Sequence, residues 1–457
     1  MRRRGVVLVV VLVITALAVM VAASLLFRMT AEVAASAASS RGEQAYSSAM
    51  SGLQQAIAAL QGHAGESEVW YDNPELFRNQ FVCSDGANRW YFTIYAYNPF
   101  DPDNVRYGVT DEAGKINVNA ASGDVLLALP NMTEELVDGL LDYVDRDGET
   151  RAGGGEQDYY DRLKYPYVIK NGPLATLEEL LLVKGFGAAA VYGEDANLNG
   201  LREANEDDAD ESFPPDNRDG ELNTGMRNVA TVVSYQPPPG EADQAKIDIN
   251  GSNADLSETG LPDQTIQFIQ LYRAEGKQFR HPSELLEMRY RLTRDPRDVQ
   301  DLKAGDWIES GVGADELPIV MEKLTAGRPP RGPAIGLINV NVAGETVLSA
   351  LPGMDAASAR SIVDRRGDLN AETKTNLAWL YTQDAVDADT FKAVVPLLTT
   401  RGYQFHVQCV GFGNPIGRYC VLEAIVDVAG SAPRIVYLRN ITRLGLPLAL
   451  RPEELEL

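Results

Sequence analysis

An uncharged apolar stretch of 22 residues, from Val6 to Phe27, follows directly on the first five residues of the chain. As an α-helix rising about 1.5 Å per residue, it would span roughly 30 Å, the thickness of a bilayer's hydrocarbon core. Arg2, Arg3 and Arg4 precede it, and basic residues favour the cytoplasmic side of a membrane. The sequence therefore predicts one membrane crossing, with the rest of the chain on the far side.

Three interpretations of this stretch are open. Small residues at Ala22-Ala23-Ser24 would suit a cleaved secretory signal, although the apolar run is long for one. A plain membrane anchor is the second interpretation. The third is a pilin-like leader, in which a basic segment, residues 1–5, ends at Gly5 and the helix begins at Val6. We favour the third, with Gly5 and Val6 flanking the processing site.

The helical pattern continues beyond the membrane segment. Between Thr30 and Leu60 there is no proline, alanine is frequent, and apolar residues recur at helical spacing. We therefore predict one helix from Val6 to about Leu60. Its transmembrane half is 6–27, and its second half, beyond the membrane, is 28–62.

Strand signals lie far apart in the chain. Residues 89–97 are aromatic and β-branched, and 105–109 is the predicted partner strand. Three more strands are predicted after residue 402, at 403–410, 418–428 and 434–443. We expect the two groups to form one antiparallel sheet packed on the helix.

This arrangement predicts an α+β fold in which a large, mainly helical domain interrupts the sheet. The first part of the sheet is 63–111, and the last part, with the C-terminal tail, is 401–457. The insertion is 112–400. Chain ends that meet across an insertion are a common way to carry an extra domain.

The insertion contains an internal repeat. Residues 115–119 (Lys-Ile-Asn-Val-Asn) and 337–341 (Leu-Ile-Asn-Val-Asn) each precede a Leu-Pro pair at the same spacing, and 246–250 starts a weaker third copy. In each copy we expect a short helix, the Leu-Pro break and a second helix. Thr133 and Asp355 are the predicted N-caps of the second helices.

These units resemble the helix-hairpin-helix family, whose glycine-rich hairpins bring backbone amides up to DNA phosphates. Only Gly185-Phe186-Gly187 has the Gly-x-Gly hairpin. The chain has 65 acidic and 41 basic residues, a net charge of −24, which repels a phosphate backbone. We therefore favour a packing role for the repeats and expect no nucleic-acid partner.

The segment from Asp195 to Glu206 has the spacing of the twelve-residue calcium loop, with its turn glycine at Gly200. Oxygen ligands placed this closely repel one another unless a cation lies among them. The predicted ligands are Asp195, Asn197, Asn199, the Leu201 carbonyl, Glu203 and Glu206. We expect calcium here as a structural clamp, because long amphipathic helices do not flank the loop. A solvated acidic loop is the alternative.

Two other acidic clusters are weaker candidates for calcium. One directly follows the loop and would supply a second ion through Asp207, Asp208, Asp216 and Asp219. The other is 145–149 (Asp-Arg-Asp-Gly-Glu), with Glu156 and Asp158 after a glycine-rich link. A solvated loop is again the alternative for both.

The chain has three cysteines. Cys409 and Cys420 flank a turn-rich stretch, residues 411–417, so we predict that they face each other across a hairpin and form a disulfide, which an extracytoplasmic compartment allows. Cys83 would then be free or paired in another way.

Signals of catalysis are poor. His63, His281 and His406 are far apart, and the chain has neither HExxH nor GxSxG. We expect structural or surface roles for the histidines and do not expect an enzyme.

The combination of leader, long helix, split sheet and insertion resembles the K-type minor pseudopilins of type II secretion (general secretion pathway protein K). The segment Asp111-Glu-Ala-Gly-Lys-Ile-Asn-Val-Asn119 carries this resemblance, and 171–174 and 177–185 are similar as well. Most pilins have Glu at the fifth residue after cleavage, whereas this chain has Val10, a departure that the K type shares. Val6 replaces the usual Phe at the new N-terminus.

The resemblance implies that prepilin peptidase cuts after Gly5 and that Val6 is then methylated. It implies a single-pass inner-membrane protein with a periplasmic domain, located at the tip of the pseudopilus. The I-type and J-type minor pseudopilins and the major pseudopilin would be its partners. One alternative is a membrane-anchored DNA-uptake or competence protein, since such receptors also join a membrane helix to helix-hairpin-helix units. The other alternative is an extracytoplasmic enzyme with an unrecognised site.

Overall fold

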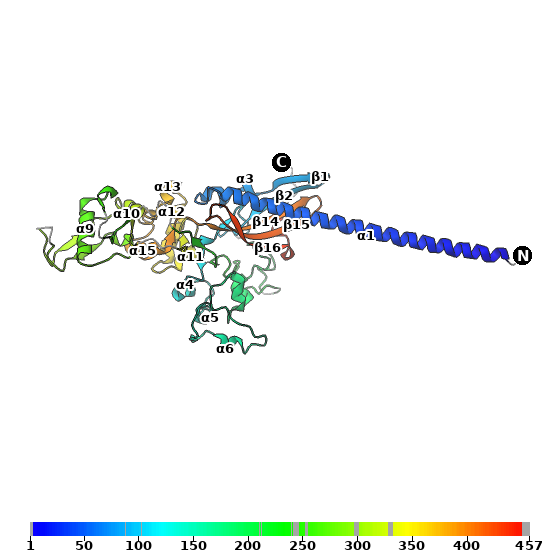
Figure 1. The fold of residues 1–457 in the computed structure, drawn as a ribbon, viewed down its shortest axis with the longest axis horizontal. Coiled ribbons are helices and arrows are strands. Elements are labelled where there is room, and N and C mark those ends of the chain that lie inside the picture. Colours follow the sequence, from blue (N-terminus) through cyan, green and yellow to red (C-terminus); the bar gives the residue numbers. More distant parts are fainter. Residues whose placement is uncertain are drawn as a thin grey trace.

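The computed structural model describes residues 3–86, 88–101, 103–209, 211, 213–238, 240, 246–251, 255–296, 301–327 and 332–449. Its first element is a single helix, α1 (Arg3–Leu60), so the predicted continuous helix is confirmed. The N-terminal half of α1 extends from the rest of the molecule as a bare rod (Figure 1). Among the described residues, Val7–Leu60 is the one helix apolar and long enough to cross a membrane, with a mean hydropathy of 2.9 in its most apolar part.

The second half of α1 packs on the sheet through small residues. Ala45, Ala49 and Leu53 are fully buried and follow one another at helical spacing. Gly411 of the sheet lies so close to this face that an added Cβ would be 2.3 Å from the Ala45 carbonyl oxygen. Alanine and glycine therefore allow the helix and sheet backbones to come into direct contact.

The sheet is antiparallel and joins the two ends of the chain. Its strand order is β1-β2-β14-β15-β16, and β3 also pairs with β14. In its centre Phe92 of β2 lies opposite Gly411 of β14, which confirms the predicted pairing across the insertion. The strands are β1 (Gln80–Asp85), β2 (Asn88–Tyr95), β3 (Thr110–Asp111), β14 (Gln404–Asn414), β15 (Tyr419–Asp427) and β16 (Arg434–Asn440).

The predicted strand at 105–109 is wrong. That segment makes only an isolated bridge between Ala96 and Arg106, and β1 occupies the edge beside β2 instead. The reason is Arg106, whose buried guanidinium donates to the carbonyl oxygens of Tyr97 and Val109 at 3.0 and 2.7 Å. A side chain, rather than a strand ladder, thus holds this segment in place.

The cysteines do not form the predicted disulfide, and Cys409, Cys420 and Cys83 are all free thiols. In the β14–β15 register Cys420 lies opposite Gly411, while Cys409 lies opposite Leu422. Such diagonal neighbours have Cβ atoms up to about 7–8 Å apart, whereas a disulfide needs about 3.5–4.5 Å. The hairpin was predicted correctly, but its register is offset by two residues from the one a disulfide requires.

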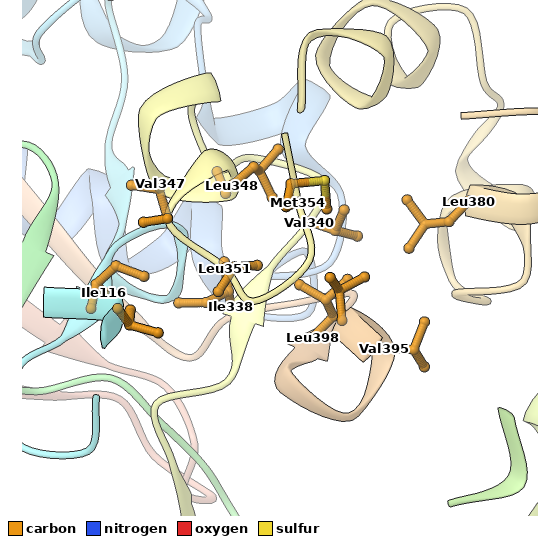
Figure 2. Close-up of a cluster of buried hydrophobic side chains, with 14 of the residues drawn as sticks. Ile116, Ile338, Val340, Val347, Leu348, Leu351, Met354, Leu380, Val395 and Leu398 are labelled. Atoms are coloured by element: carbon orange, nitrogen blue, oxygen red, sulfur yellow. The ribbon is translucent and has the colours of Figure 1, made fainter. Parts of the chain in front are cut away.

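The three repeats of the insertion share one plan, in which the first and last segments of each form a short parallel pair. The pairs are β4 with β5, β7 with β10, and β12 with β13. Thr133 and Asp355 cap the second helices of the first and last repeats, as predicted, through hydrogen bonds of 3.3 Å to the Leu136 amide and 2.7 Å to the Ser358 amide. Figure 2 shows Ile116 and Ile338, one from each of these repeats, in a shared buried cluster.

The last residue of each repeat motif is an asparagine that ties the unit together. Asn119 exchanges two hydrogen bonds with the Leu174 backbone, at 2.8 and 3.0 Å. Asn250 does the same with Phe279, at 2.9 and 2.8 Å. Asn341 donates to the carbonyl oxygens of Lys374 and Thr400, at 3.0 and 2.8 Å. The repeated asparagine is therefore explained by a structural bond that recurs in every copy.

The insertion divides into two lobes at the end of α1 remote from the N-terminus (Figure 1). One lobe holds α4 to α6, and the other holds α9 to α15. The helices after α1 are α2 (Ser67–Trp70), α3 (Pro74–Phe77), α4 (Gly123–Leu127), α5 (Glu134–Val144), α6 (Gln157–Tyr160), α7 (Ala188–Tyr192), α9 (Asp263–Ala274), α10 (Leu317–Lys323), α11 (Glu345–Ser349), α12 (Ala356–Arg366), α13 (Ala371–Lys374), α14 (Trp379–Thr382) and α15 (Ala388–Val394). The short strands are β4 (Ile116–Asn117), β5 (Ala230–Thr231), β6 (Tyr235–Gln236), β7 (Ile247–Asp248), β8 (Arg289–Arg291), β9 (Trp307–Glu309), β10 (Leu324–Thr325), β11 (Ala334–Ile335), β12 (Ile338–Asn339) and β13 (Leu398–Thr399).

Candidate functional site

The predicted calcium loop, residues 195–206, lies where the insertion meets the sheet. The carbonyl oxygen of Leu198, within the loop, accepts hydrogen bonds from Gln408 of β14 at 2.9 Å and from Arg227 at 3.0 Å. Asn199 donates to the Pro447 carbonyl oxygen, near the C-terminus, at 3.0 Å. The loop is therefore bonded to the sheet as well as to the insertion.

The start of the loop is folded by Asp195. Its two carboxylate oxygens accept hydrogen bonds from the backbone amides of Asn199 and Gly200, both at 3.0 Å. Gly200 has a φ of +72°, a conformation that glycine adopts without strain, and its Cα faces Tyr97 closely. The turn predicted for position six of the loop is thus present.

The end of the loop is drawn back onto its start by Glu206. The carboxylate of Glu206 accepts from the amides of Ala196 and Glu203, both at 3.1 Å. Asp195 is 2% exposed and Glu206 1% exposed. Burial raises the pKa of Asp195, although Arg227 opposes the shift, and burial raises the pKa of Glu206 to about 7. Two carboxylates that are costly to ionise therefore lie in one closed loop.

The remaining predicted ligands lie in the same loop. Glu203 accepts from the side-chain amides of Asn197 and Asn199, at 2.9 and 3.2 Å. The Asn199 side-chain oxygen accepts from the Leu201 amide at 2.8 Å. The predicted ligand residues are therefore drawn together, and their oxygens are of the hard type that calcium prefers. The Asp195, Glu203 and Glu206 carboxylates are not among the described groups of three whose ligand atoms lie within 4.8 Å of one another, so calcium in this loop remains a prediction.

The acidic residues behind the loop are used differently. Asp216 accepts from the amides of Ala209 and Arg218, at 2.8 and 2.7 Å, and Asp219 accepts from the Glu221 amide at 2.8 Å. Asp208 accepts from the Glu211 amide at 2.9 Å, and Asp207 lies 3.8 Å from Arg202. These carboxylates shape their own exposed loop, so a second ion here remains a prediction.

Sequence reasoning missed a buried ion-pair network beside the loop. Glu423 of β15 is bonded to Arg227 and lies 2.9 Å from both His406 Nε2 and Arg439 Nε. Burial opposes the ionised form of Glu423, but the His406 hydrogen bond and the charges around it hold its pKa well below the usual range. A glutamate inside the apolar run of strand 418–428 was the available signal, since a buried charge needs a partner.

A second missed junction involves the segment that carries the family resemblance. The Asp111 carboxylate accepts from the Asn339 side chain at 2.7 Å and from the Ala113 amide at 2.8 Å, which ties β3 to the last repeat. Burial raises the pKa of Asp111 to about 7. Next to it, Lys115 and Glu112 form a buried ion pair of 2.7 Å. These polar residues therefore join the sheet to the insertion.

The predicted processing residues Gly5 and Val6 lie within the helical backbone at the start of α1, and cleavage there remains a prediction. The three histidines are separate in space as well as in sequence. His63 is 3.0 Å from Glu66, His281 caps the turn at Ser283, and His406 contacts Glu423. Their contacts agree with the structural or surface roles predicted for them.

Comparison with known proteins gave a family match within the insertion. Residues 114–192 match the family model described as "Type II secretion system (T2SS), protein K". No curated protein matches the chain. Among solved structures, the chain is similar to one chain of the crystal structure of the GspK-GspI-GspJ complex from the enterotoxigenic Escherichia coli type 2 secretion system. The identity is 12% and the TM-score 0.36, over 88% of this chain and 98% of that one.

The matched segment runs from the buried Lys115 pair, through the first repeat, to α7 directly before the candidate calcium loop. It includes the residues Lys115 to Asn119 that carried the resemblance in the sequence. The match agrees with the resemblance found in the sequence, and residues 114–192 are similar to protein K of the type II secretion system.

Proposed function

We propose that this chain is a minor pseudopilin located at the tip of the type II secretion pseudopilus, where it starts or caps assembly and so supports protein export across the outer membrane. The observation that carries the proposal is the joining of a protein K segment, residues 114–192, to a single long apolar helix. The role is mechanical and needs no catalytic group.

The exposed N-terminal half of α1 supports assembly into a filament. Side chains along the first half of α1 have no cover, as Val7 at 62% and Phe27 at 74% exposure show. A helix that is apolar all round is stable only in a bilayer or among other apolar helices. In this proposal α1 anchors the chain in the inner membrane, with the head in the periplasm, and later packs against the helices of neighbouring subunits.

The head, which is the sheet together with the insertion 112–400, supports a position at the end of the filament. The insertion extends beyond the end of α1 and to its side (Figure 1). A second subunit stacked along the same axis would have to occupy that space. Val10 agrees with this position, because a subunit with no neighbour above it has no N-terminal amine to pair with a glutamate.

We further propose that calcium binds the Asp195–Glu206 loop. A bound calcium ion would supply positive charge to Asp195 and Glu206, whose ionisation burial disfavours. The loop would then be fixed in the shape that presents the Leu198 carbonyl to Gln408 and Arg227. Calcium would thereby hold the insertion on the sheet.

Co-purification tests the proposed assembly. The full chain in detergent would be mixed with the I-type and J-type minor pseudopilins, which the resemblance implies as partners, and analysed by size-exclusion chromatography. We expect a stable complex. When the major pseudopilin is added, we expect no subunit to join on the side of the insertion. Failure to bind either partner, or retention on DNA at moderate salt, would contradict the proposal.

A further inference from the structure

A cleft of about 740 Å³ lies where the sheet meets the first and last repeats. Its walls come mainly from three parts of the chain, the segment 97–115, the loop 217–229 and residues 342–366 of the last repeat. Two arginines, Arg106 and Arg366, line this cleft. Because buried or partly buried cations normally have an anionic partner, we looked for the partner of each.

The first of these cations, Arg106, is buried without an ion pair. It is 5% exposed, and among the described residues it donates only to uncharged oxygens, those of Tyr71, Tyr97, Val109 and Thr110. The charge of Asp72 favours the ionised form of Arg106, but the Asp72 carboxylate is bonded to the Tyr107 amide at 2.8 Å. Burial lowers the pKa of Arg106. The positive charge in this wall is therefore incompletely balanced.

The second cation, Arg366, keeps one edge of its guanidinium free. Its Nη1 donates to the carbonyl oxygens of Val340 and Ala343, at 2.9 and 2.6 Å. Among the described residues no oxygen accepts from Nε or Nη2, and neither nitrogen is a buried atom without a partner, so both remain open to solvent. These two N–H groups lie side by side on the guanidinium and match the two oxygens of a carboxylate. Burial lowers the pKa of Arg366 as well, and an anion would oppose that shift.

The repeat itself does not require an arginine at this position. Arg366 is the last residue of the 11-residue helix α12, and Val144 is the last residue of the equivalent 11-residue helix α5 in the first repeat. An apolar side chain therefore suffices to end this helix in the same structural unit. The charge of Arg366 is available for a role beyond packing.

The other charged residues of the cleft restrict what it can bind. Asp111, Lys115 and Glu345 have partners of their own, at 2.7, 2.7 and 3.1 Å. Asp219 and Glu221 also line the cleft and are exposed, so they would repel a long polyanion such as a nucleic acid. A ligand with one negative charge, placed at Arg366, avoids most of this repulsion.

We propose that this cleft binds a single carboxylate group, held by Nε and Nη2 of Arg366 and by the positive charge of Arg106. Apolar side chains also line the cleft, those of Phe100, Val342, Val347 and Val363. The ligand class is therefore a carboxylate that carries an apolar group, such as the C-terminus of a peptide that ends in an apolar residue. Phosphate offers similar oxygens but no apolar body. The inference goes beyond the proposed role in secretion and does not depend on it.

Titration of the full chain in detergent with N-acetylleucine, followed by ligand-observed NMR, tests the site. N-acetylleucinamide is the comparison ligand without the negative charge, and inorganic phosphate is the anion without the apolar group. We expect the parent protein to bind N-acetylleucine at least about tenfold more tightly than either comparison ligand. Binding of the amide or of phosphate as tight as that of N-acetylleucine, or no binding of N-acetylleucine, would overturn the proposal.

A matched pair of variants locates the site. Arg366→Gln removes the free edge and its charge, whereas Arg365→Gln makes the same change of net charge at the exposed neighbour on α12. We expect Arg366→Gln to bind N-acetylleucine at least about tenfold more weakly, and Arg365→Gln to bind it as the parent does. N-acetylleucine should also raise the unfolding temperature of the parent and of Arg365→Gln, but not that of Arg366→Gln.

Arg366→Lys keeps the result decisive if Arg366→Gln does not fold. Lysine retains the charge and can still donate to the Val340 carbonyl oxygen, but it lacks the paired N–H groups. Binding of N-acetylleucine should therefore weaken in this variant while the unfolding temperature without ligand stays close to that of the parent. Unchanged binding in the folded Arg366 variants, or equal weakening in Arg365→Gln, would overturn the proposal.

Discussion

The two acidic loops of the insertion satisfy their carboxylates in different ways. In the loop 195–206 the oxygens of Asp195 and Glu206 accept hydrogen bonds from the loop's own amides, and the loop is bonded to the sheet. In the loop 145–156 two buried oxygens, Oδ1 of Asp145 and Oε1 of Glu156, have no donor among the described residues. A linear motif identified the first loop, whereas the sequence indicated the second only as an acidic cluster and the structure shows which of its carboxylates come together. Close spacing in sequence and convergence in space are thus separate signs of a cation site.

The largest effect is expected at the sheet side of the first loop. Glu423→Ala would leave Arg227 without its carboxylate, and removing one partner of a buried ion pair costs about 3–5 kcal/mol. Thermal unfolding of the head, followed by tryptophan fluorescence, would measure the loss. Glu178→Ala is the control, because Glu178 also contacts Arg439 but is 31% exposed, and we expect it to cost about 1 kcal/mol or less. Equal losses in both variants would show that burial of the network is unimportant.

Calcium removal is expected to have the next largest effect. An ion present at a hundred times its dissociation constant stabilises the folded state by about 2.7 kcal/mol, provided that it does not bind the unfolded chain. We expect a chelator to lower the unfolding temperature of the parent protein. In the double variant Asp195→Asn with Asp147→Asn the chelator should have no effect. A response that persists in the double variant would place the ion elsewhere.

A smaller effect on stability is expected from pH, through the ionisation of Asp111. Neither acidic loop takes part in the Asp111 junction. The folded pKa of Asp111 is raised by burial to about 7, only partly offset by the bonds from Asn339 and Ala113. Its contribution to stability is therefore full below pH of about 4, the unfolded pKa, and is lost as pH rises toward 7. Unfolding temperatures between pH 4 and 8, measured without calcium, should fall less steeply in Asp111→Asn than in the parent. Identical slopes would contradict this assignment.

No effect is expected from reductant. Cys409 and Cys420 are free and offset by two residues across the hairpin, so the sheet relies on packing and ion pairs rather than a covalent link. Unfolding temperatures with and without dithiothreitol should agree. A lower unfolding temperature after reduction would mean that the predicted disulfide does form. A thiol titration that finds fewer than three free cysteines in the unfolded chain would mean the same.

Much of the fold was predictable because periodic patterns encode local structure. The apolar run after Gly5 predicted α1, and the caps Thr133 and Asp355 predicted where α5 and α12 begin. The strand at 105–109 was predicted wrongly because a single buried arginine outweighed β propensity there. The tertiary contacts of the site were not accessible. The Glu423 network joins residues 227, 406, 423 and 439, and no local spacing brings those positions together.

The split sheet has a consequence for the order in which the chain acquires its structure. Phe92 and Gly411 are direct neighbours in the finished sheet, yet the whole insertion is synthesised between them. Closing so long a loop is entropically slow, whereas each repeat completes its own contacts over shorter distances. We therefore expect the repeats to complete their contacts first, while the β2 edge stays unpaired until β14 (Gln404–Asn414) has been synthesised. An interrupted polypeptide would leave that edge, and the alanine face of α1 beneath it, exposed to aggregation.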